Sequence, residues 1–212
     1  MNNSLERVLK RIDKEQKDNL IPADYFYTQP LSKDKYEWHF TILGVEDTPF
    51  EKGIYHGYFK LPKDYPMNPP DVYFTTPNGR FQVNSKICLN ITGYHKEAWT
   101  PAWSLRTMVQ AICAYMLVNE YGIGAIFDND KNRKEYAMKS RKFCCPHCGS
   151  LANIESLIIS NRANNNTNNI ENKDSTAIEV PESKLNKRNN IKENTKIESS
   201  VKAKRVKKAQ NK

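Results

Sequence analysis

The chain of 212 residues lacks any long apolar run, since no stretch approaches the roughly 18 apolar residues that cross a bilayer as a helix. It also lacks a signal-peptide pattern, because its N-terminus is polar and its apolar residues there have helical spacing. Its five cysteines are an odd number and suggest no disulfide framework. We therefore expect no membrane span in this chain and a reducing compartment such as the cytoplasm.

Residues 151–212 contain no glycine and no aromatic side chain, and they are rich in asparagine and basic residues. Thirteen Lys/Arg stand against seven Asp/Glu there, so this segment carries most of the formal net charge of +9. A segment so poor in large apolar groups cannot offset the conformational entropy lost on ordering. We expect a disordered tail, in which the basic run 201–208 is typical of a nuclear localisation signal, an acidic-surface patch or a merely solvated segment.

Residues 1–150 are enough for one domain with a sizeable core, and their near-neutral charge argues against a nucleic-acid groove. Ser4 and Ser104 can each cap a helix with a stripe of apolar residues, and Asp130 opens a shorter helix towards residue 142. The order of helix, antiparallel strands, long loop and helices predicts an α+β domain. The predicted strands are 36–42, 54–61 and 71–75.

Cys88 lies between apolar residues, after a turn-rich segment and before a rigid loop that contains tryptophan and proline. This arrangement can hold a thiol accessible, although a free cysteine is more often a small buried hydrophobe. Cys113 fits that second description, because it belongs to the apolar stripe of the helix after Ser104. Residues 77–103 have no sustained period, and a long irregular stretch in a compact domain is usually functional. Cys88 is therefore a candidate nucleophile.

Four segments, in their order and spacing, carry a resemblance to a known family. They are residues 9–15 of the first helix, Tyr65-Pro66-Met67-Asn68-Pro69-Pro70, Ile87-Cys88-Leu89 and Trp99-Thr100-Pro101-Ala102. Together they resemble the ubiquitin-conjugating enzymes over about residues 4–150, so we expect a catalytic domain there and the tail after it. The resemblance implies the ubiquitin-conjugating fold, with an N-terminal helix, an antiparallel meander sheet, a long active-site loop and C-terminal helices.

Three further segments resemble the J-type branch of that family, whose members are usually anchored in the endoplasmic reticulum membrane and serve protein quality control. Residues 76–81 stand where most of the family has His-Pro-Asn, and residues 91–95 and 143–150 also match the branch. The hydrophobic C-terminal anchor of the branch is missing from this sequence. We expect a role in endoplasmic-reticulum-associated degradation, in the cytoplasm or at the cytosolic face of that membrane.

The resemblance implies that Cys88 accepts ubiquitin from a ubiquitin-activating enzyme as a thioester. With a ligase, of the RING type by expectation, it would pass ubiquitin to a lysine or hydroxyl of a protein substrate. A cysteine suits this chemistry because its thiolate is a strong nucleophile and leaves readily, so neither a metal nor an organic cofactor is needed. An inactive binding module and an enzyme for a ubiquitin-like modifier are the rival hypotheses, and retention of Cys88 argues against the first.

Transfer to an amine passes through a tetrahedral oxyanion, which a fixed hydrogen-bond donor stabilises. The family usually supplies an asparagine eight residues before the cysteine, but this sequence has Arg80 there. Asn78, Asn84 and Asn90 are possible substitutes, with Asn78 the first choice and Asn84 the second. Each of them also suits a purely structural role, because asparagine favours turns through its own backbone hydrogen bonds.

Three titratable residues near this loop are candidates for supporting roles. Glu120 and His95 are possible acids or bases that would orient and deprotonate the incoming amine, with an ordinary loop histidine as the alternative for His95. Lys86 can favour the thiolate electrostatically or stand by as an ordinary exposed lysine.

Two candidate partner surfaces follow from the resemblance. A basic helix face would meet an acidic domain of the activating enzyme, with a solvated surface as the alternative. This face consists of Arg7, Lys10, Arg11 and Lys14. Two loops match those that dock ligase domains, with Trp99 packed inward, and exposed apolar loop tips are otherwise hard to explain. The docking residues are Met67, Pro101, Ala102 and Trp103.

The segment Cys144-Cys145-Pro146-His147-Cys148 is the one place where metal binding enters consideration. Zinc needs four well-spaced ligands, and this segment has no second pair of cysteines or histidines elsewhere in the sequence to complete the set. We therefore expect no metal site, and interpret the segment as a surface cluster or a redox-sensitive one.

Overall fold

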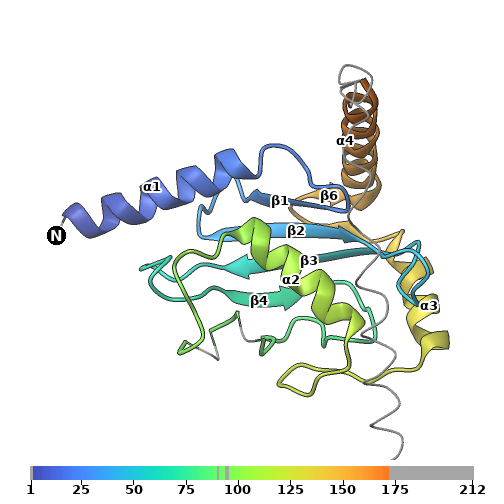
Figure 1. Ribbon diagram of the computed structural model, residues 1–212. Coiled ribbons are helices and arrows are strands. Elements are labelled where there is room, and N and C mark those ends of the chain that lie inside the picture. Colours follow the sequence, from blue (N-terminus) through green and yellow to red (C-terminus); the bar gives the residue numbers. More distant parts are fainter. Residues whose placement is uncertain (1, 90, 94–95, 172–212) are drawn as a thin grey trace, which may run out of the picture. The chain divides into compact units, whose positions relative to one another are not determined.

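A computed structural model describes residues 2–89, 91–93 and 96–171. The expected α+β fold is confirmed: a four-stranded antiparallel sheet has the order β1-β2-β3-β4, and helices precede and follow it (Figure 1). The strands are β1 Phe26–Pro30, β2 Glu37–Leu43, β3 Ile54–Lys60 and β4 Asp71–Phe74, and a separate hairpin pairs β5 Cys144–Cys145 with β6 Gly149–Ser150. The helices are α1 Asn2–Asp18, α2 Leu105–Leu117, α3 Asp130–Ser140 and α4 Leu151–Glu171.

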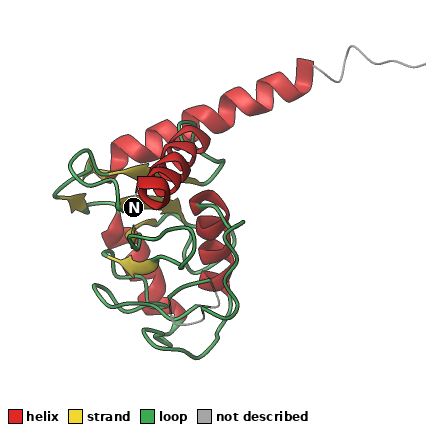
Figure 2. Ribbon diagram, turned by 90° about the vertical axis from the view of Figure 1, so that its left-hand side faces the viewer, coloured by secondary structure: helices red, strands yellow, loops and turns green. Residues whose placement is uncertain are grey.

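The main core lies between the sheet and α2. Trp38, Phe40 and Ile42 alternate along β2 and are all buried, as the period of two predicts. α2 covers this face with its own buried stripe, and burying each such large side chain contributes about 1.5–3 kcal/mol. Figure 2 shows the strands between helices, with the long loops gathered at the end of the fold away from α4.

Strand β1 was not predicted from the sequence. It pairs along its whole length with β2, from Phe26 opposite Ile42 to Pro30 opposite Trp38. Five residues that include two polar side chains and end in proline carry no periodic signal, and a proline is tolerated there because β1 is an edge strand. Pairing with β2 therefore determines this strand, and its own pattern does not.

α1 also differs from the expectation at its start. The helix begins at Asn2, so Ser4 lies within it and the predicted cap at Ser4 is wrong. Leu5 belongs to the apolar stripe by spacing, yet its side chain is 52% exposed, whereas Val8 and Ile12 are buried. Figure 1 shows that the first turns of α1 extend beyond the sheet, and the core cluster includes Val8 and Ile12 but not Leu5.

The segment after residue 150 begins with α4, so the expectation of disorder from residue 151 is wrong for this helix. Leu151, Ile154 and Ile158 recur at helical spacing and are buried in a second hydrophobic cluster with Ile54 of β3. The polar composition of the tail as a whole concealed this short stripe, which gains its stability from packing against the sheet.

The compact unit that contains the sheet ends at Ile170 rather than near residue 150. Residues 172–212, with the basic run at 201–208, lie outside the described residues. Within the described part of the chain, no helix combines the length and apolar composition needed to cross a membrane.

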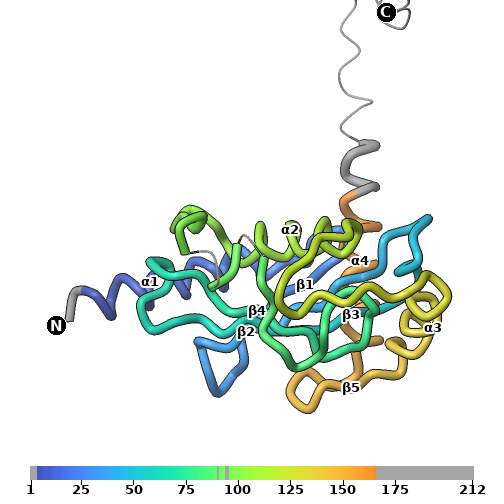
Figure 3. Tube along the Cα trace, turned by 90° about the horizontal axis from the view of Figure 1, so that it is seen from below, coloured from blue at the N-terminus to red at the C-terminus, as the bar shows by residue number. Residues whose placement is uncertain are grey.

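The two faces of the sheet are covered by different parts of the chain. α2 lies against one face and the hairpin of β5 and β6 against the other, with the sheet between them (Figure 3). Tyr27, Leu43 and Phe143 pack around the second cluster, and the backbone N–H of Ile54 donates to Ser140 Oγ at 2.9 Å. The hairpin and the start of α4 are therefore packed into the fold.

Candidate functional site

Cys88 lies in an irregular segment between β4 and α2, as the sequence predicts. Its backbone N–H donates to the carbonyl of Ile123 at 2.9 Å, and the N–H of Ile87 donates to Val72 at 3.0 Å. Ile87 and Leu89 are buried, whereas Cys88 is partly exposed. Two apolar neighbours thus anchor the segment in the core and leave the thiol between them accessible.

A small pocket beside Cys88 is lined in part by Arg80, Tyr115 and Glu120. Gly122 also lines it, and a Cβ built on this glycine would lie 3.2 Å from the carbonyl oxygen of Cys88 and 3.9 Å from its Cβ. The loop after α2 therefore passes directly beside the cysteine, and a glycine at this position adds no side chain to the pocket. Glu120, a candidate acid or base from the sequence, thus lies at the same pocket as Cys88.

Asn78 is fully buried, and its amide is engaged in a tight turn. Its Oδ1 accepts from the backbone N–H groups of Arg80 at 2.9 Å and Phe81 at 2.7 Å, while its Nδ2 donates to the carbonyl of Thr76 at 3.0 Å. Gly79 lies inside the turn with a φ of 72°, a conformation that glycine adopts without strain. Asn78 does not line the pocket beside the cysteine in this structure.

Arg80, which precedes the cysteine by eight residues, ties the pocket to the end of α2. Its side chain is 1% exposed, and its Nε donates to the carbonyls of Tyr115 at 3.2 Å and Val118 at 2.8 Å. Its Nη2 donates to the carbonyl of Glu120 at 3.1 Å, and its Nη1 has no hydrogen-bond partner among the described residues. Burial lowers the pKa of Arg80. A cation suits this place because the last carbonyls of a helix carry partial negative charge.

The other candidate residues of this loop lie in different environments. Asn84 is exposed and has a φ of 55°, a left-handed conformation that asparagine tolerates, so it is a turn residue in this structure. Lys86 forms an ion pair with Asp71, with 2.6 Å between its Nζ and the carboxylate Oδ1. Asn90 and His95 lie outside the described residues.

A buried carboxylate joins the first helix to the loops around the site. Glu15 is 1% exposed and accepts from Arg11 Nε at 2.8 Å, from the Tyr65 hydroxyl at 2.8 Å and from the Leu105 N–H at 3.0 Å. Burial and the Glu15 charge raise the pKa of Tyr65. α1, the bend that begins at Tyr65 and the start of α2 are therefore held at one point.

Only three of the four residues of the predicted basic face of α1 are exposed to solvent. Arg11 turns inward, where its guanidinium pairs with Glu15 and donates to the carbonyls of Pro101 and Trp103. It thus helps to build the tryptophan loop instead of offering a free charge to solvent. The exposed members of the face are Arg7, Lys10 and Lys14.

The two loops expected to dock a ligase are joined by a tryptophan. Trp99 packs against the core as predicted, and its Nε1 donates to the carbonyl of Pro66 at 2.8 Å. Met67 beside that proline is 68% exposed, while Trp103 is partly buried. Apolar tips from both loops are accordingly presented to solvent. They are Met67, Pro101 and Ala102.

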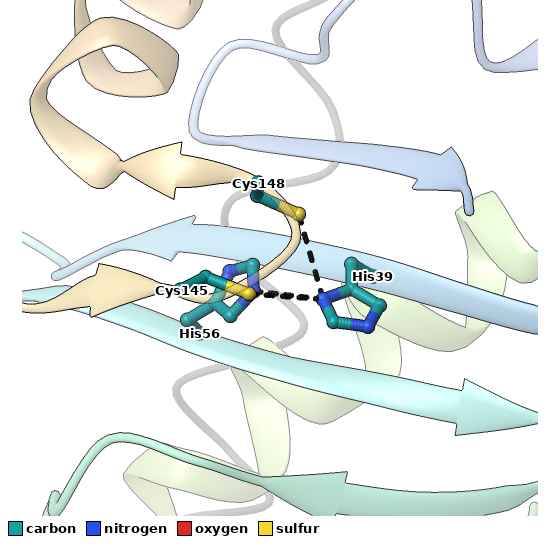
Figure 4. Close-up of side chains that lie close together, drawn as sticks. All are labelled: His39, His56, Cys145 and Cys148. Carbon is teal, nitrogen blue, oxygen red and sulfur yellow. Dashed lines mark hydrogen bonds between the residues drawn. The ribbon is translucent and has the colours of Figure 1, made fainter. Parts of the chain in front are cut away.

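A second cluster of reactive side chains lies on the other face of the sheet (Figure 4). His39 of β2 and His56 of β3 face Cys145 and Cys148 of the hairpin, and the ligand atoms of all four lie within 4.8 Å of one another. The expectation that the hairpin cysteines have no second pair of ligands is therefore wrong, because His39 and His56 supply that pair. Single histidines in separate strands give no spacing signal, although strand alternation already put both on the face opposite the main core.

Comparisons with known proteins all find members of the same family. The family model described as Ubiquitin-conjugating enzyme matches residues 11–143. Ubiquitin-conjugating enzyme E2 J1 of Homo sapiens is 45% identical over 143 residues, which are 67% of this chain and 45% of that protein. Ubiquitin-conjugating enzyme E2 32 of Arabidopsis thaliana is 44% identical over 142 residues, or 66% of this chain and 45% of that protein.

Two further relatives extend the comparison. Ubiquitin-conjugating enzyme E2 J2 of Homo sapiens is 38% identical over 122 residues, which are 58% of this chain and 47% of that protein. A solved structure from Plasmodium yoelii, described as a ubiquitin conjugating enzyme, is similar with a TM-score of 0.54 and 25% identity, covering 63% of this chain and 94% of that one. The matched region thus spans less than half the length of these curated relatives.

Proposed function

Because the chain belongs to the ubiquitin-conjugating enzyme family and is of its J type, we propose that it carries ubiquitin as a thioester on Cys88. The observation that supports this is the partly exposed thiol, anchored by buried neighbours beside a pocket that Gly122 leaves open. Cys113, by contrast, is buried in the core, and burial raises its pKa to about 12. A large acyl donor reaches the first thiol and not the second.

Two transfers make up the proposed reaction. The Cys88 thiolate attacks the carbonyl carbon of ubiquitin's C-terminal thioester on the activating enzyme, forming a new C–S bond while the enzyme's thiolate leaves. A substrate amine then attacks the same carbon, so that a C–N bond forms, the Cys88 thiolate leaves and the amine loses its proton to a base. Thiolates are good nucleophiles and good leaving groups, which keeps both steps accessible without a cofactor.

The setting of this activity is proposed from the J-type similarity. We place the enzyme in protein quality control, in endoplasmic-reticulum-associated degradation at the cytosolic face of that membrane, with a RING-type ligase as its partner. Its exposed Arg7, Lys10 and Lys14 would meet an acidic surface of the activating enzyme, where opposite potentials raise the association rate.

A charging assay tests the proposed function. The full chain is incubated with activating enzyme, ATP and either ubiquitin or one of several ubiquitin-like modifiers, and the products are separated with and without reductant. We expect an adduct with ubiquitin that reductant removes. A chain that forms no adduct with ubiquitin, or forms one only with another modifier, would contradict the proposal.

Ligase docking at the two apolar loop tips gives a prediction. We expect Met67→Ala and Ala102→Asp each to weaken ligase binding about 10-fold or more, because exposed apolar anchors at the centre of an interface carry about 1–2 kcal/mol or more each. Charging of Cys88 should stay unchanged. A binding titration with a RING-type ligase domain and a discharge assay measure the two effects. Met138→Ala, at another exposed methionine, is the matched control, and unchanged ligase affinity in both loop variants rules this docking surface out.

We propose that Asn78 supports transfer through its turn, which holds Arg80 against the pocket, and that Asn84 shapes the same loop. Asn78→Ala leaves two buried N–H groups without their acceptor, at about 1–3 kcal/mol for each, so stability, charging and discharge should fall together. Asn78→Asp keeps the accepting oxygen but loses the donor to the Thr76 carbonyl, so charging and discharge should again fall together, and not discharge alone.

Single-turnover rates of charging and of lysine discharge distinguish this role from direct catalysis. If Asn78 donated a hydrogen bond to the oxyanion, Asn78→Asp would slow discharge alone, by about 10²–10³-fold. Asn84→Gly, which suits the left-handed φ of the exposed turn, is measured beside it and should change both rates only slightly.

A further inference from the structure

Four potential metal ligands converge between the sheet and the C-terminal hairpin. His39 and His56 project from neighbouring strands, and Cys145 and Cys148 come from the two ends of the loop that closes the hairpin (Figure 4). His39, His56 and Cys145 are buried, and Cys148 is partly buried. Two imidazoles and two thiols form the donor set that favours a tetrahedral zinc ion.

The distances fit one ion. In a zinc tetrahedron, Zn–N bonds of about 2.0–2.1 Å and Zn–S bonds of about 2.3 Å put two nitrogens about 3.3 Å apart and a nitrogen and a sulfur about 3.5 Å apart. Here His39 Nδ1 lies 3.0 Å from His56 Nε2 and 3.5 Å from each sulfur of Cys145 and Cys148. With all four atoms within 4.8 Å of one another, the space between them matches a single ion.

Hydrogen bonding alone does not account for these contacts. His39 Nε2 lies 3.1 Å from the carboxylate of Glu37, which only accepts, so this nitrogen carries the proton and Nδ1 has a lone pair. One lone pair accepts one good hydrogen bond, yet three potential ligand atoms crowd around Nδ1. An ion at their centre would satisfy all four groups at once.

The surroundings have the properties of a metal site as well. Metal-bound histidines usually hydrogen-bond through their second nitrogen, and here Glu37 contacts His39 while Thr41 Oγ1 lies 2.9 Å from Nδ1 of His56.

The sulfur atoms have their own donors. The backbone N–H of His147 donates to Cys145 Sγ at 3.5 Å, and Gln29 Nε2 donates to Cys148 Sγ at 3.6 Å. Gly149, directly after the second cysteine, has a φ of 76°, which lets the chain turn back into β6. The hairpin therefore directs both sulfurs to the sheet, with donors suited to stabilising thiolates.

We propose that His39, His56, Cys145 and Cys148 bind one Zn²⁺ ion that fastens the hairpin and α4 to the sheet. All four positions are filled by protein ligands, so the ion has no open position for a substrate and its role is structural. Binding converts both thiols to thiolates and releases their two protons, so affinity falls as the pH is lowered. The site is independent of the thioester chemistry proposed for Cys88.

Metal content of the full chain tests this proposal. After purification under reductant and desalting, elemental mass spectrometry should find about one zinc ion per chain, and Cys148→Ser should lose it. Cys144→Ser is the matched control, because Cys144 is the exposed neighbour of Cys145 and is absent from the cluster. Cys144→Ser should keep its zinc. Less than a tenth of an equivalent in the unchanged chain, or equal loss in both variants, would overturn the proposal.

Two further measurements keep the test decisive if Cys148→Ser does not fold. Cobalt added to the metal-free chain should give the intense visible bands of a tetrahedral ion and a sulfur-to-metal charge-transfer band; their absence would contradict the site. Glu37→Gln leaves all four ligands in place and should weaken zinc binding about 10–100-fold in a chelator competition. Unchanged affinity there, or a disulfide between Cys145 and Cys148 in the freshly purified chain, would also count against it.

Discussion

Replacing Cys88 with alanine should abolish the ubiquitin adduct completely while leaving the fold intact. The side chain is partly exposed, and its neighbours Ile87 and Leu89, which anchor the segment, are retained. Loss of the sulfur removes the proposed nucleophile, and among the described cysteines Cys88 is the one that lines the pocket beside Gly122. The measurement is a charging assay with activating enzyme, ATP and ubiquitin, analysed with and without reductant.

Two variants control this experiment. Cys144→Ser removes an exposed thiol elsewhere and should charge like the unchanged chain. Cys88→Ser keeps a nucleophilic atom, and because an alkoxide leaves less readily than a thiolate, any adduct should be an ester that resists reductant and discharges slowly. A reductant-sensitive adduct that survives in Cys88→Ala would refute the assignment of the nucleophile.

Replacing Glu15 with alanine should lower the stability of the fold strongly. Glu15→Ala removes the acceptor shared by the Arg11 guanidinium, the Tyr65 hydroxyl and the Leu105 N–H. An arginine left partly buried without its partner makes breaking such a pair strongly destabilising, so we expect the free energy of unfolding to fall by about 3–5 kcal/mol. Denaturant titration measures this change through the transition midpoint at constant slope.

The same helix offers a matched control. Lys10 and Glu6 form an ion pair four residues apart, as Arg11 and Glu15 do, but both of its side chains are exposed. Exposed pairs contribute about 0–1 kcal/mol, so Glu6→Ala should hardly change the midpoint. Similar losses in Glu6→Ala and Glu15→Ala would show that the buried carboxylate has no special structural role. Glu15→Gln, which keeps one accepting oxygen, should fall between the two.

Local patterns predicted the parts of the fold whose stability comes from one periodic face. β2 and α2 have clear periods of two and of 3.6, and both elements formed where the spacing indicates. β1 and α4 were missed for a shared reason. A strand of five residues and a stripe of three apolar residues carry little signal of their own, and each is stable only against a partner distant in the sequence.

The candidate site was likewise predictable only where local motifs define it. Cys88 was identified from its flanking motifs, because apolar neighbours and a rigid loop are local properties of the chain. The roles of Asn78 and Arg11 were not accessible from sequence, since each depends on which polar groups the folded chain brings within reach. Periodicity described the surface of α1 but did not distinguish Arg11, which turns inward, from Lys10, which does not.

The amino-acid sequence alone settled the family, the α+β class and the cysteine proposed as nucleophile, because these depend on motifs a few residues long in a definite order. Folding alone brought His39 and His56, seventeen residues apart on adjacent strands, to two cysteines about ninety residues further on. A metal site needs four atoms around one point, and strand pairing and hairpin packing create that point in space. Spacing along the chain therefore does not predict this site, because the four ligand atoms meet only once the hairpin has packed against the paired strands.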